Sequence, residues 1–409
     1  MTKVFKFNPL EQKFRDDPYP IYDYLRTKEP VHQNIFGNWT ITRYQDIKTV
    51  LNNPSFQNKD LPKSLEQKNK YFQGEGKNIN ALASSIPKWL FYLEPPDHSR
   101  MRRLVSKAFT PRVVEELRPQ IQATANELID VVENRGSMDI MSEYASPLPI
   151  ITISKLLGIP LDNSSKVHHW AAEIVHVMSD RLLSQQAYEK INQAFVEFNQ
   201  YLREIISEKT SNPQQDLISE LIRTSYQTEK LNEEELLATC IQLFGAGEET
   251  TVNLLGNGML TLLRHPEAME QLKQSPEIIP SAVEEILRYE SPVQQIRRVA
   301  IEDTVLGGKK IKAGEYVELY LGAANRDPEQ FLNPNQLNLT RPDNHHLAFA
   351  DGIHHCLGAP LARVQAQIAI NTIFHRLPNL QLQTNKLEWI ENIAFRGLKT
   401  LPVIFEKQK

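Results

Sequence analysis

The amino-acid sequence predicts a mainly α-helical fold with small β-sheets. Three long stretches, residues 111–134, 185–211 and 232–264, place apolar residues at the spacing of amphipathic helices. Strand signals are short and few by comparison. No Gly/Ser tract, repeat or long run of charge divides the 409-residue chain, so we expect a single domain over residues 1–409.

The order of the elements follows from their end signals. Pro111 suits the first turn of the first long helix, where the N–H that proline lacks would have no partner. The third long helix opens with Asn232 as its cap and three glutamates in its first turn, which complement the positive end of the helix dipole. Shorter helices are expected at 280–289 and 359–377, and strands at 31–33, 39–42, 298–301, 316–320 and 402–405.

Composition excludes several classes of protein. Lys and Arg number 46 against 50 Asp and Glu, and a net charge of −4 argues against binding driven by nucleic-acid phosphates. No apolar run is long enough to span a bilayer, and the first residues lack the apolar core of a secretion signal. We therefore expect a cytoplasmic protein that binds neither nucleic acid nor membrane. The two cysteines, Cys240 and Cys356, form no disulfide framework.

The most informative segment is the cysteine loop, residues 346–363, which reads HLAFADGIHHCLGAPLAR. It carries the pattern F-x-x-G-x-x-x-C-x-G immediately before a predicted helix, at Phe349, Gly352, Cys356 and Gly358. The glycines allow tight turns and close approach to a flat partner. Loop N–H groups and the helix N-terminus can stabilise a negative sulfur. The loop therefore predicts a thiolate that binds a metal.

Two other interpretations of Cys356 remain open at this point. A buried cysteine in apolar surroundings is commonly an inert thiol of the core. The neighbouring histidines also suit zinc, since His and Cys are its usual ligands, and the set would be His345, His346, His354, His355 and Cys356.

A second unusual segment, residues 244–255, reads FGAGEETTVNLL inside the third long helix. Gly245 and Gly247 each cost roughly 1 kcal/mol relative to alanine in a helix interior. Thr250 and Thr251 add two β-branched residues. A helix selected for stability alone would avoid this composition. The plainer interpretations are that Thr250 bonds its own i−4 carbonyl, and that the adjacent glutamates form a solvated face.

Together these segments resemble the cytochrome P-450 family, the haem-thiolate monooxygenases. The resemblance runs from about residue 8 to residue 405 and includes the E-x-x-R pattern at Glu285 and Arg288, AANRDP at 323–328 and the terminal RGLKTLPVIF. It implies a triangular helical prism in which haem lies between a long distal helix and the cysteine loop. Non-covalent haem b is expected, because the chain has no C-x-x-C-H attachment motif.

The resemblance also assigns roles to residues. Cys356 would be the proximal ligand of the haem iron, and Phe349 would cover one side of the sulfur. Ala246 and Gly247 would open a groove for O₂, and Thr250 and Glu249 would be the catalytic pair that donates a hydrogen bond to oxygen and relays protons. The haem propionates would be bound by His98, Arg102, Arg298 and His354.

The sequence departs from the family pattern at two positions. Ala350 stands where many members carry glycine, which makes the loop stiffer without removing the ligand. Gln336 stands where many relatives have an arginine that completes the Glu285–Arg288 network, so this pair is expected to recruit another partner. Beside the cysteine loop, a basic face is predicted to attract an acidic electron donor, through Arg100, Arg102, Arg103, Lys107 and Arg363.

The expected function is insertion of one atom of O₂ into a C–H bond or an alkene of an apolar small molecule. The overall sequence looks closest to bacterial hydroxylases of polyketides and macrolides. We expect a monomer without a fused reductase, supplied with electrons by a separate ferredoxin or flavodoxin and its NAD(P)H reductase. The alternatives are a peroxide-driven peroxygenase and a non-catalytic haem-binding protein. Predominantly apolar pocket segments are predicted at 83–91, 174–183, 243–246, 293–296 and 393–395.

Overall fold

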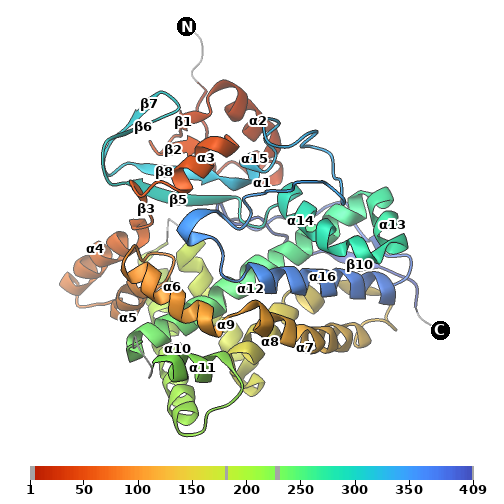
Figure 1. Cartoon of the computed structure of the whole chain (residues 1–409), viewed down its shortest axis with the longest axis horizontal. Helices are drawn as coiled ribbons and strands as arrows, with labels where there is room; N and C mark the ends of the chain where they lie inside the picture. Colours follow the sequence, from red (N-terminus) through yellow and green to blue (C-terminus); the bar gives the residue numbers. More distant parts are fainter. Residues whose placement is uncertain (1–4, 180–182, 226–230, 408–409) are drawn as a thin grey trace.

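A computed structural model describes residues 5–179, 183–225 and 231–407. Figure 1 shows a sheet-rich part at the upper left and a larger helical part below and to the right. The α-helices are α1 (Gln12–Asp16), α2 (Tyr19–Lys28), α3 (Tyr44–Leu51), α4 (Asp60–Gly74), α5 (Asn80–Ser85), α6 (Asp97–Ala108), α7 (Pro111–Asp130), α8 (Pro147–Leu157), α9 (Ser164–Ser179), α10 (Gln185–Ser211), α11 (Leu217–Ser225), α12 (Glu233–Arg264), α13 (Pro266–Gln274), α14 (Ile279–Tyr289), α15 (Leu321–Ala324) and α16 (Ala359–Arg376).

The strands form three small sheets. They are β1 (Val31–Gln33), β2 (Trp39–Ile41), β3 (Phe56–Gln57), β4 (Ser137–Asp139), β5 (Gln295–Ala300), β6 (Thr304–Leu306), β7 (Lys309–Ile311), β8 (Tyr316–Tyr320), β9 (Gln381–Leu382) and β10 (Pro402–Ile404). The largest sheet has the order β1-β2-β8-β5-β3, in which β2 and β8 pair in parallel and the other neighbours are antiparallel. The others are β4-β10-β9 and the hairpin β6-β7.

The predicted class, mainly α with small sheets, is confirmed, and the long helices lie where the pattern placed them. The predicted helix 111–134 ends earlier, at Asp130, where the chain enters a turn. The predicted strand at 298–301 begins earlier, at Gln295, because its pairing with β8 runs from Gln295 to Val299. Among the described residues, no helix combines the length and the apolar character needed to cross a membrane.

Helix α12 runs through the helical part and packs against α8, α9, α14 and α16. Its first turn is a complete capping box, in which Asn232 accepts from the N–H of Glu235 and the Glu235 side chain accepts from the N–H of Asn232. Most of its residues are buried on all sides, which explains why its apolar pattern is less one-sided than that of a surface helix.

A buried ion pair holds the segment that leads into the cysteine loop. The side chains of Glu285 and Arg288 on α14 are both fully buried. Arg288 uses all five of its N–H groups, on the two carboxylate oxygens of Glu285 and on backbone carbonyls of Asn325, Pro334 and Gln336. Every donor is therefore matched, which is the condition for a tolerable buried charge.

The third member of this network is a second cation, Arg341. Its Nε lies 3.0 Å from Oε2 of Glu285, and Asn344 donates to the same oxygen at 3.1 Å. Gln336, for which the resemblance implied an arginine, contributes its backbone carbonyl to this network, to Arg288 and to Arg341. The expectation of a different partner is met by an arginine five residues further along the chain.

Candidate active site

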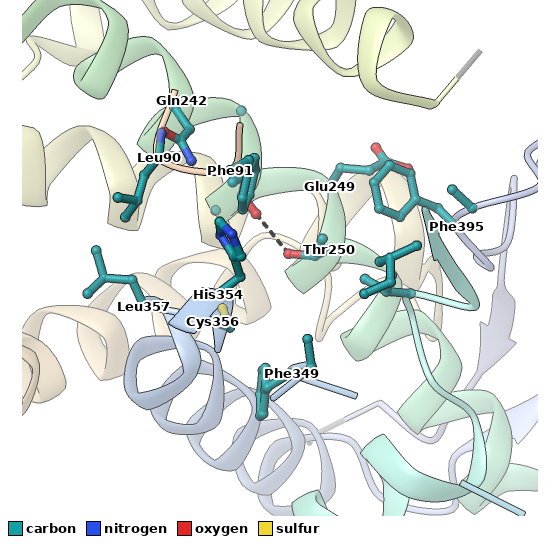
Figure 2. Close-up of a pocket in the computed structure, with 18 of the residues that line it drawn as sticks. Leu90, Phe91, Gln242, Glu249, Thr250, Phe349, His354, Cys356, Leu357 and Phe395 are labelled. Atoms are coloured by element: carbon teal, nitrogen blue, oxygen red, sulfur yellow. Dashed lines mark hydrogen bonds between the residues drawn. The ribbon is translucent and has the colours of Figure 1, made fainter. Parts of the chain in front are cut away.

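A cavity of about 510 Å³ lies between α12 and the cysteine loop. Figure 2 shows Thr250 and Glu249 of α12 on one side and Cys356, Phe349 and His354 of the loop on the other. All five predicted pocket segments contribute to its wall, through Leu90, Phe91, Val175, Val177, Leu243, Ala246, Val293, Ile296, Ala394 and Phe395. Residues 180–182 of the second segment lie outside the described residues.

The cysteine loop is closed on itself by backbone hydrogen bonds. The N–H of Cys356 donates to the carbonyl of Phe349 at 3.0 Å. Ala350 and Gly352 both adopt positive φ, of 58° and 70°. A Cβ on Gly352 would lie 2.7 Å from the carbonyl oxygen of Leu51, so this position requires glycine. The left-handed backbone of Ala350 strains an alanine by roughly 1–2 kcal/mol and would suit glycine better.

The surroundings of Cys356 have opposing effects on the pKa of its thiol. Burial raises the pKa of the Cys356 thiol, while the N–H groups of Gly358 and Ala359 and the guanidinium groups of Arg102 and Arg363 lower it. Gly358 and Ala359 form the N-terminus of α16, whose dipole favours an anion. On balance the pKa stays raised. Cation binding at the sulfur would favour the thiolate, because a ligating cysteine must be deprotonated.

The hydroxyl of Thr250 faces the cavity but is engaged with its own helix. Its Oγ1 donates to the carbonyl of Ala246 at 2.8 Å, which is the i−4 bond that the plainer interpretation predicted. The hydroxyl oxygen still has lone pairs to accept a proton or a hydrogen bond. Thr250 and Ala246 thus line the same stretch of the distal wall, one helical turn apart.

The two glycines of this stretch serve helix packing. A Cβ on Gly245 would lie 3.1 Å from Ile174 of α9, and one on Gly247 would lie 3.4 Å from Ile153 of α8. Both glycines border the cavity with their backbone. Their missing side chains therefore face neighbouring helices, and Ala246 between them presents the small side chain at the cavity wall.

The adjacent glutamates of α12 are not a solvated face. Burial raises the pKa of Glu249, whose Oε1 accepts from Asn253 at 3.0 Å. Glu248 is 5% exposed and accepts from Nδ1 of His168 on α9 at 3.0 Å, and its second oxygen is buried without a hydrogen bond. Glu249 borders the cavity, whereas Glu248 points toward α9.

Three basic side chains, Arg298, His98 and His354, lie beside the cysteine loop with few hydrogen bonds to the protein, and burial lowers the pKa of His98 to about 4. Arg298 is 5% exposed, donates to the carbonyl of Arg297, and forms no ion pair within the described residues. Burial lowers the pKa of Arg298 to about 10. The rings of His98 and His354 are 4.6 Å apart, and the Nε2 atom of each is buried without a hydrogen bond. Such orphaned donors fit a buried anion such as a haem propionate.

The predicted propionate residues do not all border the cavity. Arg102, Arg298 and His354 line its wall, while His98 stands behind His354. Arg102 donates to the carbonyl of His355 at 2.7 Å. Sequence reasoning missed Glu94, whose Oε1 lies 3.8 Å from Nε2 of His354. No local pattern marked this glutamate, because its partner lies more than 250 residues away.

Some members of the predicted basic face form ion pairs within the protein. Arg100 pairs with Glu235 of α12. Arg363 forms a two-point pair with Glu284 at 2.7 and 2.8 Å and covers the ring of Phe349. Arg103 and Lys107 of α6 are exposed at the surface.

The zinc interpretation is not supported by the placement of its ligands. Within the described ranges, no group of three His, Cys, Asp or Glu side chains is placed to hold a metal ion. His346 instead contacts Glu284, and His345 and His355 are exposed. Cys240 is fully buried in the helical core, away from the cavity wall, and burial raises the pKa of its thiol to about 12.

Comparison with known proteins defines the class. The profile of the family described as cytochrome P450 matches residues 38–395, which include both walls of the cavity. This class of enzyme binds haem iron through a cysteine thiolate and uses it for monooxygenation.

The chain belongs to the cytochrome P450 family. Cytochrome P450 CYP107DY1 of Priestia megaterium is 42% identical over 374 residues, which cover 90% of this chain and 89% of the relative. The polyketide biosynthesis cytochrome P450 PksS of Bacillus subtilis is 40% identical over 413 residues, covering 98% and 99%. The crystal structure of P450BioI in complex with acyl carrier protein ligated to hexadec-9Z-enoic acid has a TM-score of 0.90 and 38% identity, covering 97% and 100%.

Proposed function

We propose that Cys356 is the thiolate ligand of the haem iron, that Arg298, Arg102 and His354 bind the haem propionates, and that His98 supports His354 from behind. The observation that carries the proposal is the pairing of one thiol at a helix N-terminus with unmatched buried donors beside it. A buried cation without a partner is costly in the empty protein. That cost would be recovered when two carboxylates enter the cavity.

When bound, haem supplies the activation of O₂ that inserts one oxygen atom into the substrate. The chain's own contribution is proton supply and exclusion of water. Glu249 is the proton source at the wall, since burial raises the pKa of its carboxyl and favours the protonated form. Thr250 lies one residue further on the same wall and can pass a proton through its hydroxyl. The apolar lining keeps bulk water from bypassing this pair.

We propose an apolar small molecule of polyketide or fatty-acyl type as substrate, free or attached to a carrier protein. Support comes from the mostly apolar side chains that line the cavity above Cys356. It also comes from the names of two similar proteins, a polyketide biosynthesis enzyme and one crystallised with an acyl-loaded carrier protein. The electron donor is proposed to be a separate ferredoxin or flavodoxin that docks at exposed Arg103 and Lys107.

The ligand assignment is tested by the absorption spectrum of the reduced protein with carbon monoxide. We expect the red-shifted Soret band of thiolate coordination in the wild type and its loss in Cys356→Ser. The chain offers a matched control, Cys240→Ser, which removes the other thiol and should keep the band. A band that survives Cys356→Ser contradicts the assignment.

The reaction is tested by product formation with a surrogate ferredoxin and reductase, compared with peroxide alone. Turnover with the ferredoxin system and coupling that falls in Thr250→Ala support the monooxygenase. Turnover with peroxide alone, indifferent to Thr250, supports the peroxygenase. A haem protein that consumes no oxygen in the presence of any tested substrate would be a non-catalytic binder.

A further inference from the structure

Gln242 is a buried amide on the cavity wall that the proposed reaction does not use. It lies on α12 one turn before Ala246 and is 7% exposed. Its Oε1 accepts from the backbone N–H of Leu90 at 2.7 Å, which ties the segment before α6 to the distal helix (Figure 2). One end of the amide is therefore fixed to the protein.

This contact settles which way the amide points. A backbone N–H can pair only with the oxygen of the amide, so the NH₂ group must occupy the other position. Within the described residues, the Nε2 atom of Gln242 makes no hydrogen bond. A donor that stays unpaired after substrate excludes water costs about 1–3 kcal/mol. Gln242 therefore presents donors that need an acceptor from a ligand.

The neighbouring hydroxyl groups on the same face of α12 cannot replace the NH₂ group of Gln242 as a hydrogen-bond donor to a ligand. Successive positions three or four residues apart lie on one face of a helix, and four of them border the cavity here, at residues 239, 242, 246 and 250. Thr239 donates to the carbonyl of Glu235 at 2.7 Å, and Thr250 donates to that of Ala246. Both hydroxyl protons are engaged by the helix backbone. Along this face, the amide of Gln242 is the donor that remains for a substrate.

We propose that Gln242 determines specificity by donating a hydrogen bond to a neutral carbonyl oxygen of the substrate, such as that of a lactone, ketone or thioester. The inference rests on the proposed function and names the substrate class more closely. A neutral acceptor is favoured over a carboxylate, because a neutral amide in an apolar wall cannot compensate a buried charge. Leu90 and Leu243 are its apolar neighbours on the wall.

The position of Gln242 also determines where oxidation occurs. At 1.5 Å per residue, Ala246 lies about 6 Å further along the helix axis and Thr250 about 12 Å. A carbonyl held by Gln242 places the carbon beside Ala246 and Thr250 several bonds away from it. Oxidation should therefore fall at a position remote from the carbonyl.

The experiment uses the haem-loaded enzyme and two rings of equal size, the lactone oxacyclohexadecan-2-one and the hydrocarbon cyclohexadecane. Binding is followed by the spectral shift of the haem on titration. A net hydrogen bond of about 0.5–1.5 kcal/mol predicts that the wild type binds the lactone about 2- to 13-fold more tightly. Equal affinity for the two rings, or binding of neither, overturns the proposal.

Two variants separate ligand recognition from support of the loop. Gln242→Glu, measured at pH 8, keeps an acceptor for the N–H of Leu90 and removes the donor, while Gln242→Met removes both. Both should lose the lactone preference. A preference retained in Gln242→Glu would assign Gln242 to loop support and overturn the proposal. The carbon monoxide band is recorded in parallel, so that a failure of the haem assignment is seen separately.

Discussion

Two groups of buried ionisable and polar side chains flank the cysteine loop, and they differ in how completely the hydrogen-bonding capacity of their charged members is satisfied. In the closed cluster, formed by Glu285, Arg288, Arg341 and Asn344, Arg288 has all five donors paired, and only the neutral Oδ1 of Asn344 is buried without a hydrogen bond among the described residues. In the open cluster, formed by Glu94, His98, Arg298 and His354, both histidines keep an unpaired buried nitrogen, and the arginine has no ion pair within the described residues.

The difference separates a structural role from a binding role. A buried charge whose partners all come from the protein is already compensated and stabilises one arrangement of the chain. A buried charge with missing partners is a cost that only a ligand can offset. Breaking each cluster should therefore have opposite effects on the empty protein.

The largest effect is expected from Arg288→Leu, which removes the fully buried two-point partner of Glu285 and leaves it Arg341 as its cation. Removing one member of a buried pair costs about 3–5 kcal/mol. Urea unfolding should show this loss in the free energy of unfolding. Arg341→Leu is the matched control and should cost less, because Glu285 keeps Arg288. A loss below about 1 kcal/mol in Arg288→Leu would show that the cluster is not structural.

The next largest effect is a loss of folding stability in acid that depends on Glu284, a residue that lies between the closed cluster and the cysteine loop. Burial opposes its charge, but hydrogen bonds from His346 and Arg363 prevail and lower the pKa of Glu284 to about 2. A lowered pKa stabilises the fold above about pH 4.5, and the gain is lost as the pH falls toward 2. The shift corresponds to roughly 3 kcal/mol.

Unfolding free energies between pH 5 and pH 2 measure this contribution. Wild type should lose more stability over that range than Glu284→Gln. Glu127→Gln, at an exposed position on α7, is the control and should follow the wild-type curve. Parallel curves for wild type and Glu284→Gln would contradict the prediction.

The open cluster predicts a contrast between empty and haem-loaded protein. Arg298→Leu should leave the empty protein as stable as wild type or more so, because a buried unpaired charge is removed. The same change should weaken haem retention by about 1.5–3 kcal/mol, the value of a hydrogen bond to a charged group. Haem transfer to excess apomyoglobin should then be roughly 10- to 100-fold faster.

Arg297 provides the matched control for this contrast. It lies next to Arg298 on β5 but already pairs with Glu318 at 3.1 Å and with Asp60 at 3.4 Å. Arg297→Leu should destabilise the empty protein and change haem transfer less than Arg298→Leu. The distinction between the clusters fails if the two variants behave alike.

The smallest expected effect on folding stability comes from the hydrogen bond between His168 and Glu248, which joins α9 to α12. The hydrogen bond that His168 donates to Glu248 raises the pKa of His168. A raised pKa gives stability that is complete below the unfolded value near 6.5 and lost as the pH rises through the folded value. Because the His168 ring is half-exposed, the contribution stays below about 1 kcal/mol.

Thermal unfolding between pH 6 and pH 9 measures this contribution. Wild type should lose slightly more stability across that range than His168→Gln. The adjacent, exposed His169 gives the control variant His169→Gln, which should follow wild type. A wild-type curve that matches His168→Gln would exclude a role for this bond.

Much of this arrangement was predictable from local sequence. The cap at Asn232 and the helical spacing after it located α12, and the loop pattern located Cys356 at the cavity. Local patterns carry this information because caps, turns and helix faces depend on residues a few positions apart.

The remainder depends on contacts between distant segments. Arg341 replaced the expected arginine at 336 because the loop folds back toward α14, which no local spacing reveals. Glu94 and Gln242 were missed because their partners, His354 and the backbone of Leu90, lie far away in the chain. The left-handed backbone of Ala350 was likewise visible only in the folded loop.

The parallel pairing of β2 with β8 has a consequence for how the protein is made. Trp39 lies opposite Val317, so the central pair of the main sheet joins segments about 280 residues apart. At a synthesis rate of about 5–20 residues per second, β2 leaves the ribosome about 14–56 s before its partner. During that interval the N-terminal segment has an unpaired strand edge, and helices between the two strands can fold first.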